Sequence, residues 1–330
     1  ALQSISLISI LGMIAVVLVA YTIQPLIFRF FIAAPASKGL PPYTLIGLLR
    51  TVALFLLFFI GCILLRILIA LLYLVPVRKS SKQHFVCRLI QITCKGILLL
   101  ATAVKKEHIN KANERFDRPA IIIANHQSFI DILVLLSLSS KVLMMTNHWV
   151  WHSPFFGAII RYADFYYIGE GYEQYIERMK KKVEEGYSIA VFPEGTRTYN
   201  GKMKRFHKGA FYLAEMLQLD ILPILLYGND KIIAKAQPFN VRKGIIYTEI
   251  LPRIPAGDPS FGATYQERTK RISTYMKQEY ARICREKNTT DNPAFYEALI
   301  QNYIYKGPIV EWYIRIKVKM EGNYRLFNRL

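Results

Sequence analysis

The chain is organised around one stretch, Ile121-Ile122-Ile123-Ala124-Asn125-His126-Gln127-Ser128-Phe129-Ile130-Asp131. It begins with a run of β-branched residues, which favours a buried strand. It then leads into the apolar residues 132–138, which favour a helix. The sequence therefore places a histidine at the end of a strand, with a carboxylate five residues later.

Two interpretations of this carboxylate are open. Ser128 followed by Asp131 resembles a capping box, in which Ser128 is the N-cap and Asp131 only supports the start of a helix. Alternatively, His126 lies in the loop before that helix and donates a hydrogen bond to Asp131. Such a contact fixes the imidazole tautomer and leaves the other nitrogen to deprotonate a hydroxyl group.

A second motif, Phe192-Pro193-Glu194-Gly195-Thr196-Arg197, follows another strand-like run. Gly195 permits a tight turn or a close approach to a ligand. Arg197 begins a cationic cluster, and its planar guanidinium suits a phosphate group. The other members of the cluster are Lys202, Lys204, Arg205, His207 and Lys208. Taken alone, a basic loop of this kind is more often a solvated surface.

From Pro119 onward, strand-like and helix-like segments alternate, which predicts an α/β domain with a largely buried sheet. The predicted strands are residues 120–124, 141–145, 165–168, 188–192, 221–226 and 245–250. The predicted helices are residues 129–138, 172–185, 209–217 and 265–287.

The front of the chain predicts membrane-embedded helices. Residues 4–28 are uncharged and mostly apolar, and about 20 such residues cross a hydrocarbon core. Residues 43–75 are also apolar but contain Arg50 and Arg66, so they form either a tilted span or a broken hairpin within one leaflet. Residues 84–104 have a basic amphipathic pattern, which fits a helix at the membrane interface or one facing a core.

The composition agrees with a membrane protein. The 330 residues carry a net charge of +20 at a mean hydropathy of +0.22, which requires apolar and basic residues to be segregated along the chain. Such a charge favours an anionic partner: lipid headgroups, nucleic acid or an acidic carrier protein. No usual nucleic-acid motif is present, so we expect membrane lipids and no nucleic acid. The four cysteines and the pair His148 and His152 suggest neither a disulfide framework nor a metal site.

Together, the two motifs resemble those of the glycerolipid acyltransferase family, the PlsC-type 1-acylglycerol-3-phosphate O-acyltransferases. The family signature N-H-x4-D is matched by Asn125, His126 and Asp131, and F-P-E-G-T-R-S by residues 192–197 followed by Thr198. A further signature, an apolar strand with a central proline, is matched by Leu222-Pro223-Ile224-Leu225, and Lys208-Gly209-Ala210 also fits.

This resemblance implies a mixed α/β sheet flanked by helices and preceded by membrane-embedded helices. It implies that His126 is the general base, oriented by Asp131, and that an acyl-CoA or acyl carrier protein thioester is the donor, without a cofactor or metal. The residues implied for the acceptor site are Glu194, Gly195, Thr196, Arg197 and Lys208. The enzyme would act at the cytoplasmic face of the cell inner membrane.

One position departs from the family pattern. The family's second signature is a glycine-led strand that ends in an arginine, and Glu170 stands at the matching position here. A glutamate would repel a phosphate group, so either the alignment slips, the acceptor differs, or another cation compensates. The cations considered are Arg161, Lys204 and Arg205.

We therefore expect four parts: a transmembrane helix (1–33), membrane-embedded or interfacial helices (34–104), an acyltransferase domain (105–290) and an aromatic, basic extension (291–330). Residues 4–28 loosely resemble the last helix of bacterial lipid exporters, which suggests a fusion with a transporter and a further enzyme domain. The alternative function is an anchor or accessory module of a lipid export assembly, with a degenerate or altered-acceptor acyltransferase domain.

Overall fold

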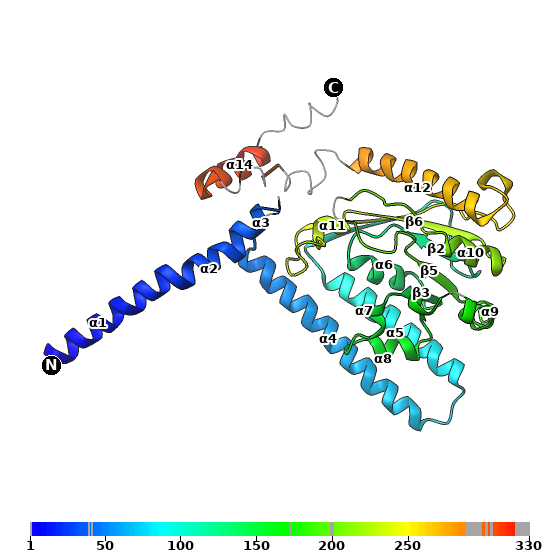
Figure 1. Cartoon of the computed structure of the whole chain (residues 1–330), viewed down its shortest axis with the longest axis horizontal. Helices are drawn as coiled ribbons and strands as arrows, with labels where there is room; N and C mark the ends of the chain where they lie inside the picture. The colour runs from blue at the N-terminus through cyan, green and yellow to red at the C-terminus, as the bar shows by residue number, and fades with distance from the viewer. Residues whose placement is uncertain are drawn as a thin grey trace. The chain divides into compact units, whose positions relative to one another are not determined.

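The computed structural model describes residues 2–38, 40, 42–171, 173–198, 201–287, 299–300, 303 and 306–320. The chain forms two compact units, one of residues 51–295 and one that combines residues 1–50 with 296–330. The sheet and the helices from α5 (Lys79–Leu100) to α12 (Tyr265–Lys287) belong to the larger unit (Figure 1).

The described residues of the larger unit contain one seven-stranded sheet in the order β1-β7-β6-β2-β5-β3-β4. Only β6 and β7 are antiparallel neighbours, so the sheet is mixed, as predicted. The strands are β1 (Val104–Asn110), β2 (Ile121–Ala124), β3 (Val142–Thr146), β4 (Tyr166–Tyr167), β5 (Ser188–Val191), β6 (Ile221–Tyr227) and β7 (Gly244–Ile250).

The six predicted strands are confirmed to within one residue at each end. Strand β1 is not among the predicted strands, because its sequence Val-Lys-Lys-Glu-His-Ile-Asn is rich in charge. It pairs only with β7 at one edge of the sheet, and edge strands tolerate charged side chains that a central strand could not bury.

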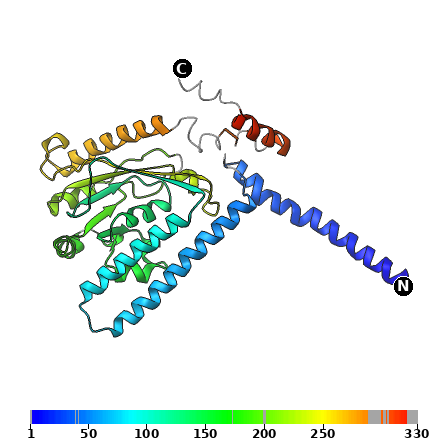
Figure 2. The same ribbon diagram turned by 180° about the vertical axis from the view of Figure 1, so that it is seen from behind.

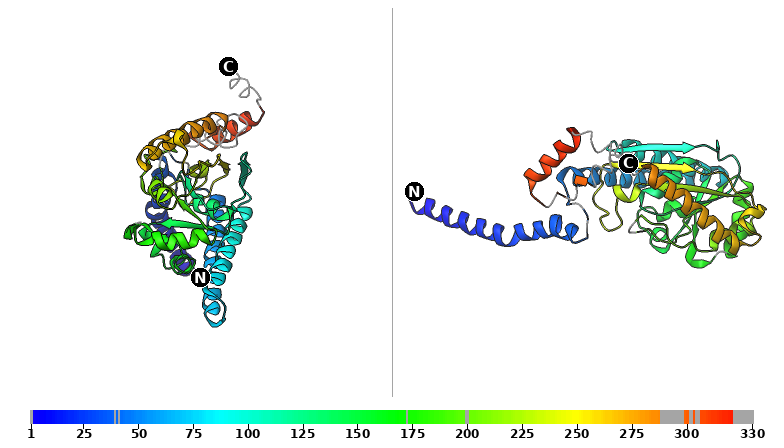
Figure 3. Two further views of the ribbon diagram at one scale, coloured as in Figure 1. Left: turned by 90° about the vertical axis from the view of Figure 1, so that its right-hand side faces the viewer. Right: turned by 90° about the horizontal axis from the view of Figure 1, so that it is seen from above.

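Helices cover both faces of the sheet. On one side α6 (Ile130–Leu138) contacts β3 and packs against α5 (Lys79–Leu100), which lies beside α4 (Leu45–Leu74). On the other side α10 (Gly209–Met216) contacts β2, and α12 (Tyr265–Lys287) contacts both α10 and β6. The views from behind and from the side show this layering (Figure 2 and Figure 3). Strand β2 lies in the middle, and its three isoleucines are at most 1% exposed.

The remaining helices of the larger unit are short, apart from α9 (Ile176–Glu184). They are α7 (His148–Trp151), α8 (Gly157–Tyr162) and α11 (Asn229–Ile232), with 3-10 turns at Ile168–Glu170, Glu173–Tyr175 and Pro259–Phe261. The four predicted helices are found, with the stretch 172–185 divided between a 3-10 turn and α9.

Four neighbouring strands point the same way and bring both motifs to one edge of the sheet. Strands β3, β5, β2 and β6 are mutually parallel, so their carboxyl ends lie together. The loops that leave these ends begin at Asn147, Phe192, Asn125 and Gly228, respectively. In parallel α/β sheets this edge is where ligands bind.

The second apolar stretch forms one unbroken helix, α4, so the alternative of a break within it is wrong. After α4 the chain turns at residues 75–78 and continues into α5 (Figure 2). Its inner face is buried at Cys62, Leu65 and Ile69, and the Thr51 hydroxyl accepts a hydrogen bond of 2.8 Å from the Val241 amide. Helix α5 likewise has a core-facing side, which contains Val86, Cys87, Ile90, Cys94 and Ile97.

The smaller unit contains a continuous helical run from α1 (Leu2–Leu18) through α2 (Gln24–Phe28) to α3 (Ala34–Ala36), joined by wider π-turns at Val19–Ile23 and Arg29–Ala33. Ile5–Ala36 and Leu45–Leu74 are both long and apolar enough to cross a bilayer, which indicates association with a membrane. This unit also contains α14 (Pro308–Met320). Much of the predicted extension 291–330 lies outside the described residues.

Candidate active site

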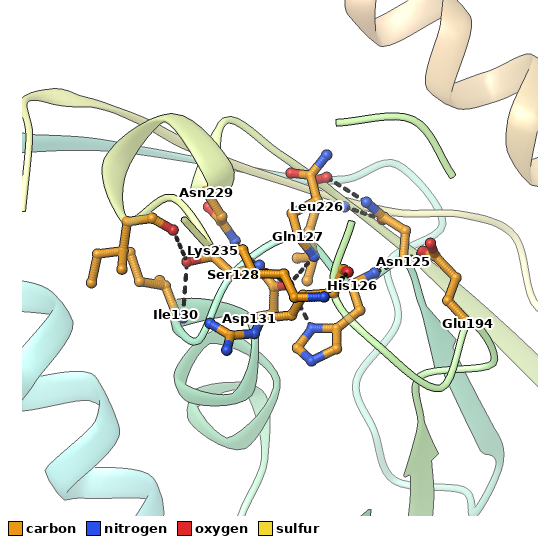
Figure 4. A network of polar contacts seen from close by, with 12 residues as sticks. Asn125, His126, Gln127, Ser128, Ile130, Asp131, Glu194, Leu226, Asn229 and Lys235 are labelled. Carbon is orange, nitrogen blue, oxygen red and sulfur yellow. Dashed lines mark hydrogen bonds and ion pairs between the residues drawn. The ribbon is translucent and has the colours of Figure 1, made fainter. Parts of the chain in front are cut away.

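The first motif brings His126 and Asp131 together. The Nδ1 atom of His126 lies 2.9 Å from Oδ2 of Asp131, and Asp131 is fully buried whereas the His126 side chain is 14% exposed (Figure 4). Because Nδ1 faces a carboxylate, the proton lies on Nδ1 and the lone pair of Nε2 is left for a substrate. The geometry is that of an imidazole held as a base by a buried carboxylate.

Three further groups hold the Asp131 carboxylate in place. Its Oδ2 accepts hydrogen bonds from the backbone amides of Gln127, at 2.5 Å, and Ser128, at 2.8 Å. Its Oδ1 accepts a bond of 2.7 Å from the side-chain amide of Asn229, at the start of α11. These bonds satisfy the buried carboxylate, so it can remain charged next to the imidazole.

The capping-box interpretation is partly right. Asp131 does accept from the Ser128 amide, as the second half of a capping box requires. However, α6 begins at Ile130 with Phe129 as its N-cap, and the Ser128 hydroxyl donates to the Ile233 carbonyl at 2.8 Å. Asp131 therefore serves the helix start and the histidine at the same time.

The imidazole ring lines an apolar pocket. It stacks on Phe192, with ring centroids 4.0 Å apart and planes 11° from parallel. Gly195 and Phe192 of the second motif line the same pocket. Much of the rest of its wall is apolar and comes from α4, α5, α6 and α8, including Leu65, Ile90, Leu136, Ile159 and Ile160. An aliphatic chain in this pocket would lie against the histidine ring.

Glu194, in the second motif, is hydrogen-bonded to the first motif. It is 3% exposed, and its two oxygens accept hydrogen bonds from the backbone amides of His126, at 2.9 Å, and Lys204, at 2.8 Å. The Thr198 amide also donates to the His126 carbonyl at 3.0 Å. Burial raises the pKa of Glu194, against the lowering effect of these two amides. Glu194 thus shapes the site through backbone contacts with both loops.

The other predicted acceptor residues lie at the surface of this loop. Thr196 is exposed and Arg197 is half-buried, and within the described residues the Arg197 guanidinium has no hydrogen-bond or ion-pair partner. Lys208 is exposed and is the N-cap of α10, and no side-chain contact in the described structure joins it to His126 or Asp131. Arg197 therefore adjoins Thr198, which contacts His126, whereas no such contact is described for Lys208.

Gly195 is the position at which this loop depends on glycine. Its φ is +68°, and a Cβ atom there would lie 3.3 Å from the His207 ring. We expect Gly195→Ala to destabilise the protein by about 1–2 kcal/mol, which lowers the melting temperature by roughly 2–8 °C. Gly257→Ala is the matched control, because Gly257 has no positive φ and no atom within 4 Å of the added Cβ. Equal melting temperatures for the two variants would contradict this reading of the turn.

Two residues of the site lie far from both motifs in sequence. Asn229 follows β6 and bonds Asp131, and Lys235, after α11, contacts the second motif (Figure 4). The side chain of Asn125 exchanges two bonds of 2.8 Å with the backbone of Leu226, which pairs the ends of β2 and β6. The sequence signal for Asn229 is its position just after a predicted parallel strand.

Comparison with known proteins finds relatives of this part of the chain. Residues 102–227 match the protein-family model "Acyltransferase". A chloroplastic 1-acyl-sn-glycerol-3-phosphate acyltransferase from Brassica napus is 35% identical over 124 residues, which are 35% of this chain and 35% of that protein. Human 1-acyl-sn-glycerol-3-phosphate acyltransferase beta is 26% identical over 144 residues, or 42% of this chain and 51% of that protein.

Residues 102–227 therefore form an acyltransferase domain. The matched residues run from just before β1 to the end of β6 and contain both motifs. In fold, the chain is similar to the crystal structure of PlsC, the 1-acyl-sn-glycerophosphate acyltransferase of Thermotoga maritima, with a TM-score of 0.61 at 20% identity. That similarity covers 72% of this chain and 95% of the other. The family resemblance drawn from the motifs is confirmed.

The limits of the match are also clear. The chain spans about a third to a half of the length of the curated relatives named here. In the acyltransferase domain, the segment that corresponds to the family's second signature forms β4 and the 3-10 turn Ile168–Glu170. The side chain of Glu170 lies outside the described part of the structure.

Proposed function

We propose that this protein is a membrane-bound O-acyltransferase that moves a fatty acyl chain from a thioester to a free hydroxyl of a lipid-like acceptor. The observation that carries the proposal is the contact of 2.9 Å between His126 Nδ1 and buried Asp131, beside an apolar pocket that His126 lines. The names of the relatives suggest 1-acyl-sn-glycerol-3-phosphate as the acceptor. Acyl-CoA or acyl carrier protein is the donor.

In this mechanism Nε2 of His126 removes the proton from the acceptor hydroxyl as its oxygen attacks the thioester carbonyl. The tetrahedral intermediate collapses, the carbon–sulfur bond breaks, and the imidazolium returns the proton to the departing thiolate. Asp131 stabilises the imidazolium between these two steps. The thioester supplies the activated acyl group and His126 supplies the base, so we expect no resident cofactor or metal.

The apolar pocket is the proposed site of the transferred acyl chain. A second apolar pocket lies next to it and shares Phe58, Ile97, Phe129 and Leu133 as a common wall. The rings of Phe58 and Phe129 meet edge to face, with centroids 6.1 Å apart. This aromatic pair therefore limits how far a chain can extend from the first pocket into the second.

We expect Phe58→Ala to open this wall and to shift the preferred acyl chain toward greater length. The ratio of kcat/KM for a longer over a shorter acyl-CoA should rise about tenfold, because a few methylenes gain an apolar environment. Phe55→Ala is the control, since Phe55 lies one turn away on α4 and lines only the second pocket. An unchanged ratio in Phe58→Ala would show that the wall does not limit chain length.

The test of the proposed function is direct. Purified protein in lipid nanodiscs is given radiolabelled acyl-CoA or acyl carrier protein with 1-acylglycerol 3-phosphate, and the lipid products are separated by mass. Formation of the diacyl product supports the proposal. Absence of any acylated product with either donor, from protein that melts cooperatively, would overturn it.

We also propose that the acyltransferase domain lies on the cytoplasmic face of a cell inner membrane. Residues 78–118 contain ten Lys or Arg and three Asp or Glu, and short basic segments stay on the cytoplasmic side. Both proposed donors are water-soluble and would reach the site from that side. The outer face of α4 is apolar and exposed, including Leu56, Ile60, Ile63 and Ile67, which suits contact with lipid.

The alternative function is an accessory module of a lipid export assembly with an inactive or altered acyltransferase domain. It is motivated by Glu170 and by the long apolar helix Ile5–Ala36. Turnover with any hydroxyl acceptor would exclude the inactive version. The contact of His126 with Asp131 favours the active enzyme, because the helix-capping role of Asp131 does not require a histidine at that position.

A further inference from the structure

Lys235 is brought to the second motif from a segment nearly forty residues away. Its ammonium group donates to the Thr196 hydroxyl at 3.2 Å and to the Arg197 carbonyl at 2.9 Å. The segment is fixed beside the first motif, because the Ser128 hydroxyl binds the Ile233 carbonyl at 2.8 Å. Figure 4 draws Lys235 in the same polar network as His126 and Asp131.

A second ammonium group meets the same carbonyl. Lys204 Nζ donates to the Arg197 oxygen at 3.1 Å, so the two lysine nitrogens are at most about 6 Å apart. Both side chains are only partly exposed, which weakens the screening of their charges by water. The Arg197 guanidinium belongs to the same residue as the shared carbonyl. The fold thus brings two ammonium groups to one carbonyl, and an anion bound at this loop could contact both of them.

The position of this cation pair relative to the base fits a particular kind of anion. The residue after Arg197, Thr198, donates its amide to the His126 carbonyl at 3.0 Å. In a 1-acylglycerol 3-phosphate, the phosphate is attached to the carbon next to the one that carries the free hydroxyl. When that hydroxyl lies at His126, its phosphate must lie within a few bonds of it, and the Arg197 loop is in that neighbourhood.

Lys204 and Lys235 also supply the positive charge that is missing at Glu170, where the family pattern has an arginine. Of the three cations considered from the sequence, the Arg161 guanidinium donates to the Trp151 carbonyl and lies over the Trp151 ring. Arg205 is exposed, and no contact of its side chain is found in the described residues. Lys204 is the one that the structure places at the second motif, and Lys235 joins it there.

Building on the proposed function, we infer that Lys235, with Lys204, binds the phosphate monoester of the acceptor next to the hydroxyl that is acylated. Lys235 is a substrate-binding residue that the two motifs do not contain. It selects acceptors that carry a phosphate on the carbon beside the free hydroxyl, and it supplies charge that Glu170 cannot supply.

The test compares two acceptors that differ only in the phosphate, 1-acylglycerol 3-phosphate and 1-acylglycerol, with one acyl-CoA. Lys235→Ala should lower kcat/KM for the phosphorylated acceptor about 10- to 100-fold, because it removes a charge-assisted hydrogen bond. The loss with 1-acylglycerol should be about tenfold smaller, because that acceptor carries no phosphate for Lys235 to bind. Lys235→Arg should restore most of the loss. Lys270→Ala, which removes an exposed charge from α12, is the control and should change neither rate.

Equal losses with the two acceptors in Lys235→Ala, or no loss with either, would overturn the inference while leaving acyl transfer intact. A measurement of acceptor binding distinguishes this outcome from a failure of the proposed acyltransferase function. In the His126→Ala background, titration with 1-acylglycerol 3-phosphate in nanodiscs should give an affinity about tenfold weaker when Lys235 is also alanine. If binding depends on Lys235 but the wild-type protein shows no turnover, the phosphate site is supported and the acyltransferase function is rejected.

Discussion

His126→Ala is expected to lower the rate of acyl transfer by about 10³- to 10⁴-fold, because no other group in contact with Asp131 can take the proton from the acceptor. The other three partners of Asp131 are two backbone amides and the side chain of Asn229, and none of them is a base near neutral pH. The loss should fall on kcat rather than on KM, since the apolar pocket and the cationic loop remain.

The measurement is single-turnover acyl transfer from radiolabelled acyl-CoA in nanodiscs, with the melting temperature as a check on folding. His108→Ala is the matched control, because His108 lies on the edge strand β1, away from the motif loops. Turnover of the His126 variant at a rate close to wild type would remove His126 from the mechanism. A melting temperature far below that of the control would show that the variant is a folding mutant.

Asp131→Asn is expected to lower kcat by about 10²- to 10⁴-fold while leaving the fold intact. The oxygen of the new amide can still face His126, Gln127 and Ser128 as Oδ2 does now. The amino group would then face Asn229, whose own side-chain oxygen is buried and without a partner in the described structure. A flip of the Asn229 amide would supply that partner, so the exchange removes a charge and little else.

The negative charge is the part that matters to the reaction, because it stabilises the imidazolium formed during transfer. Asp220→Asn makes the same exchange at the opposite end of β6, where Asp220 accepts a bond from the Ala256 amide, and it should leave kcat unchanged. If Asp131→Asn kept the wild-type kcat with the same melting temperature, the carboxylate would be only a helix-capping group.

Much of the sheet and the contact between His126 and Asp131 could be predicted, because each depends on residues that are close together in the sequence. Strands with a continuous apolar run, such as Ile121–Ala124, can be recognised from the sequence. Strand β1 cannot, because its edge position allows charged residues. The loop position of His126 also followed from its five-residue spacing to Asp131. The exact start of α6 could not be predicted, because a serine hydroxyl can cap a helix or bind another group. The Ser128 hydroxyl donates to the Ile233 carbonyl.

The partners that complete the site could not be predicted, because they are set by strand order. Asn229 meets Asp131 only because β6 lies beside β2, and Lys235 meets Arg197 only because the chain turns back after α11. Neither residue belongs to a motif with a fixed spacing. The short helices α7, α8 and α11 were missed for a related reason, since four to six residues carry too little periodicity to be recognised.

The buried carboxylate of Glu194 also limits how this enzyme can diversify. Because it holds the amides of His126 and Lys204 at once, a substitution there displaces the base and the acceptor loop together. We therefore expect a change of acceptor preference to come from outward side chains such as Thr196 and Arg197, or from distant ones such as Lys235, while a change at Glu194 would disturb both loops.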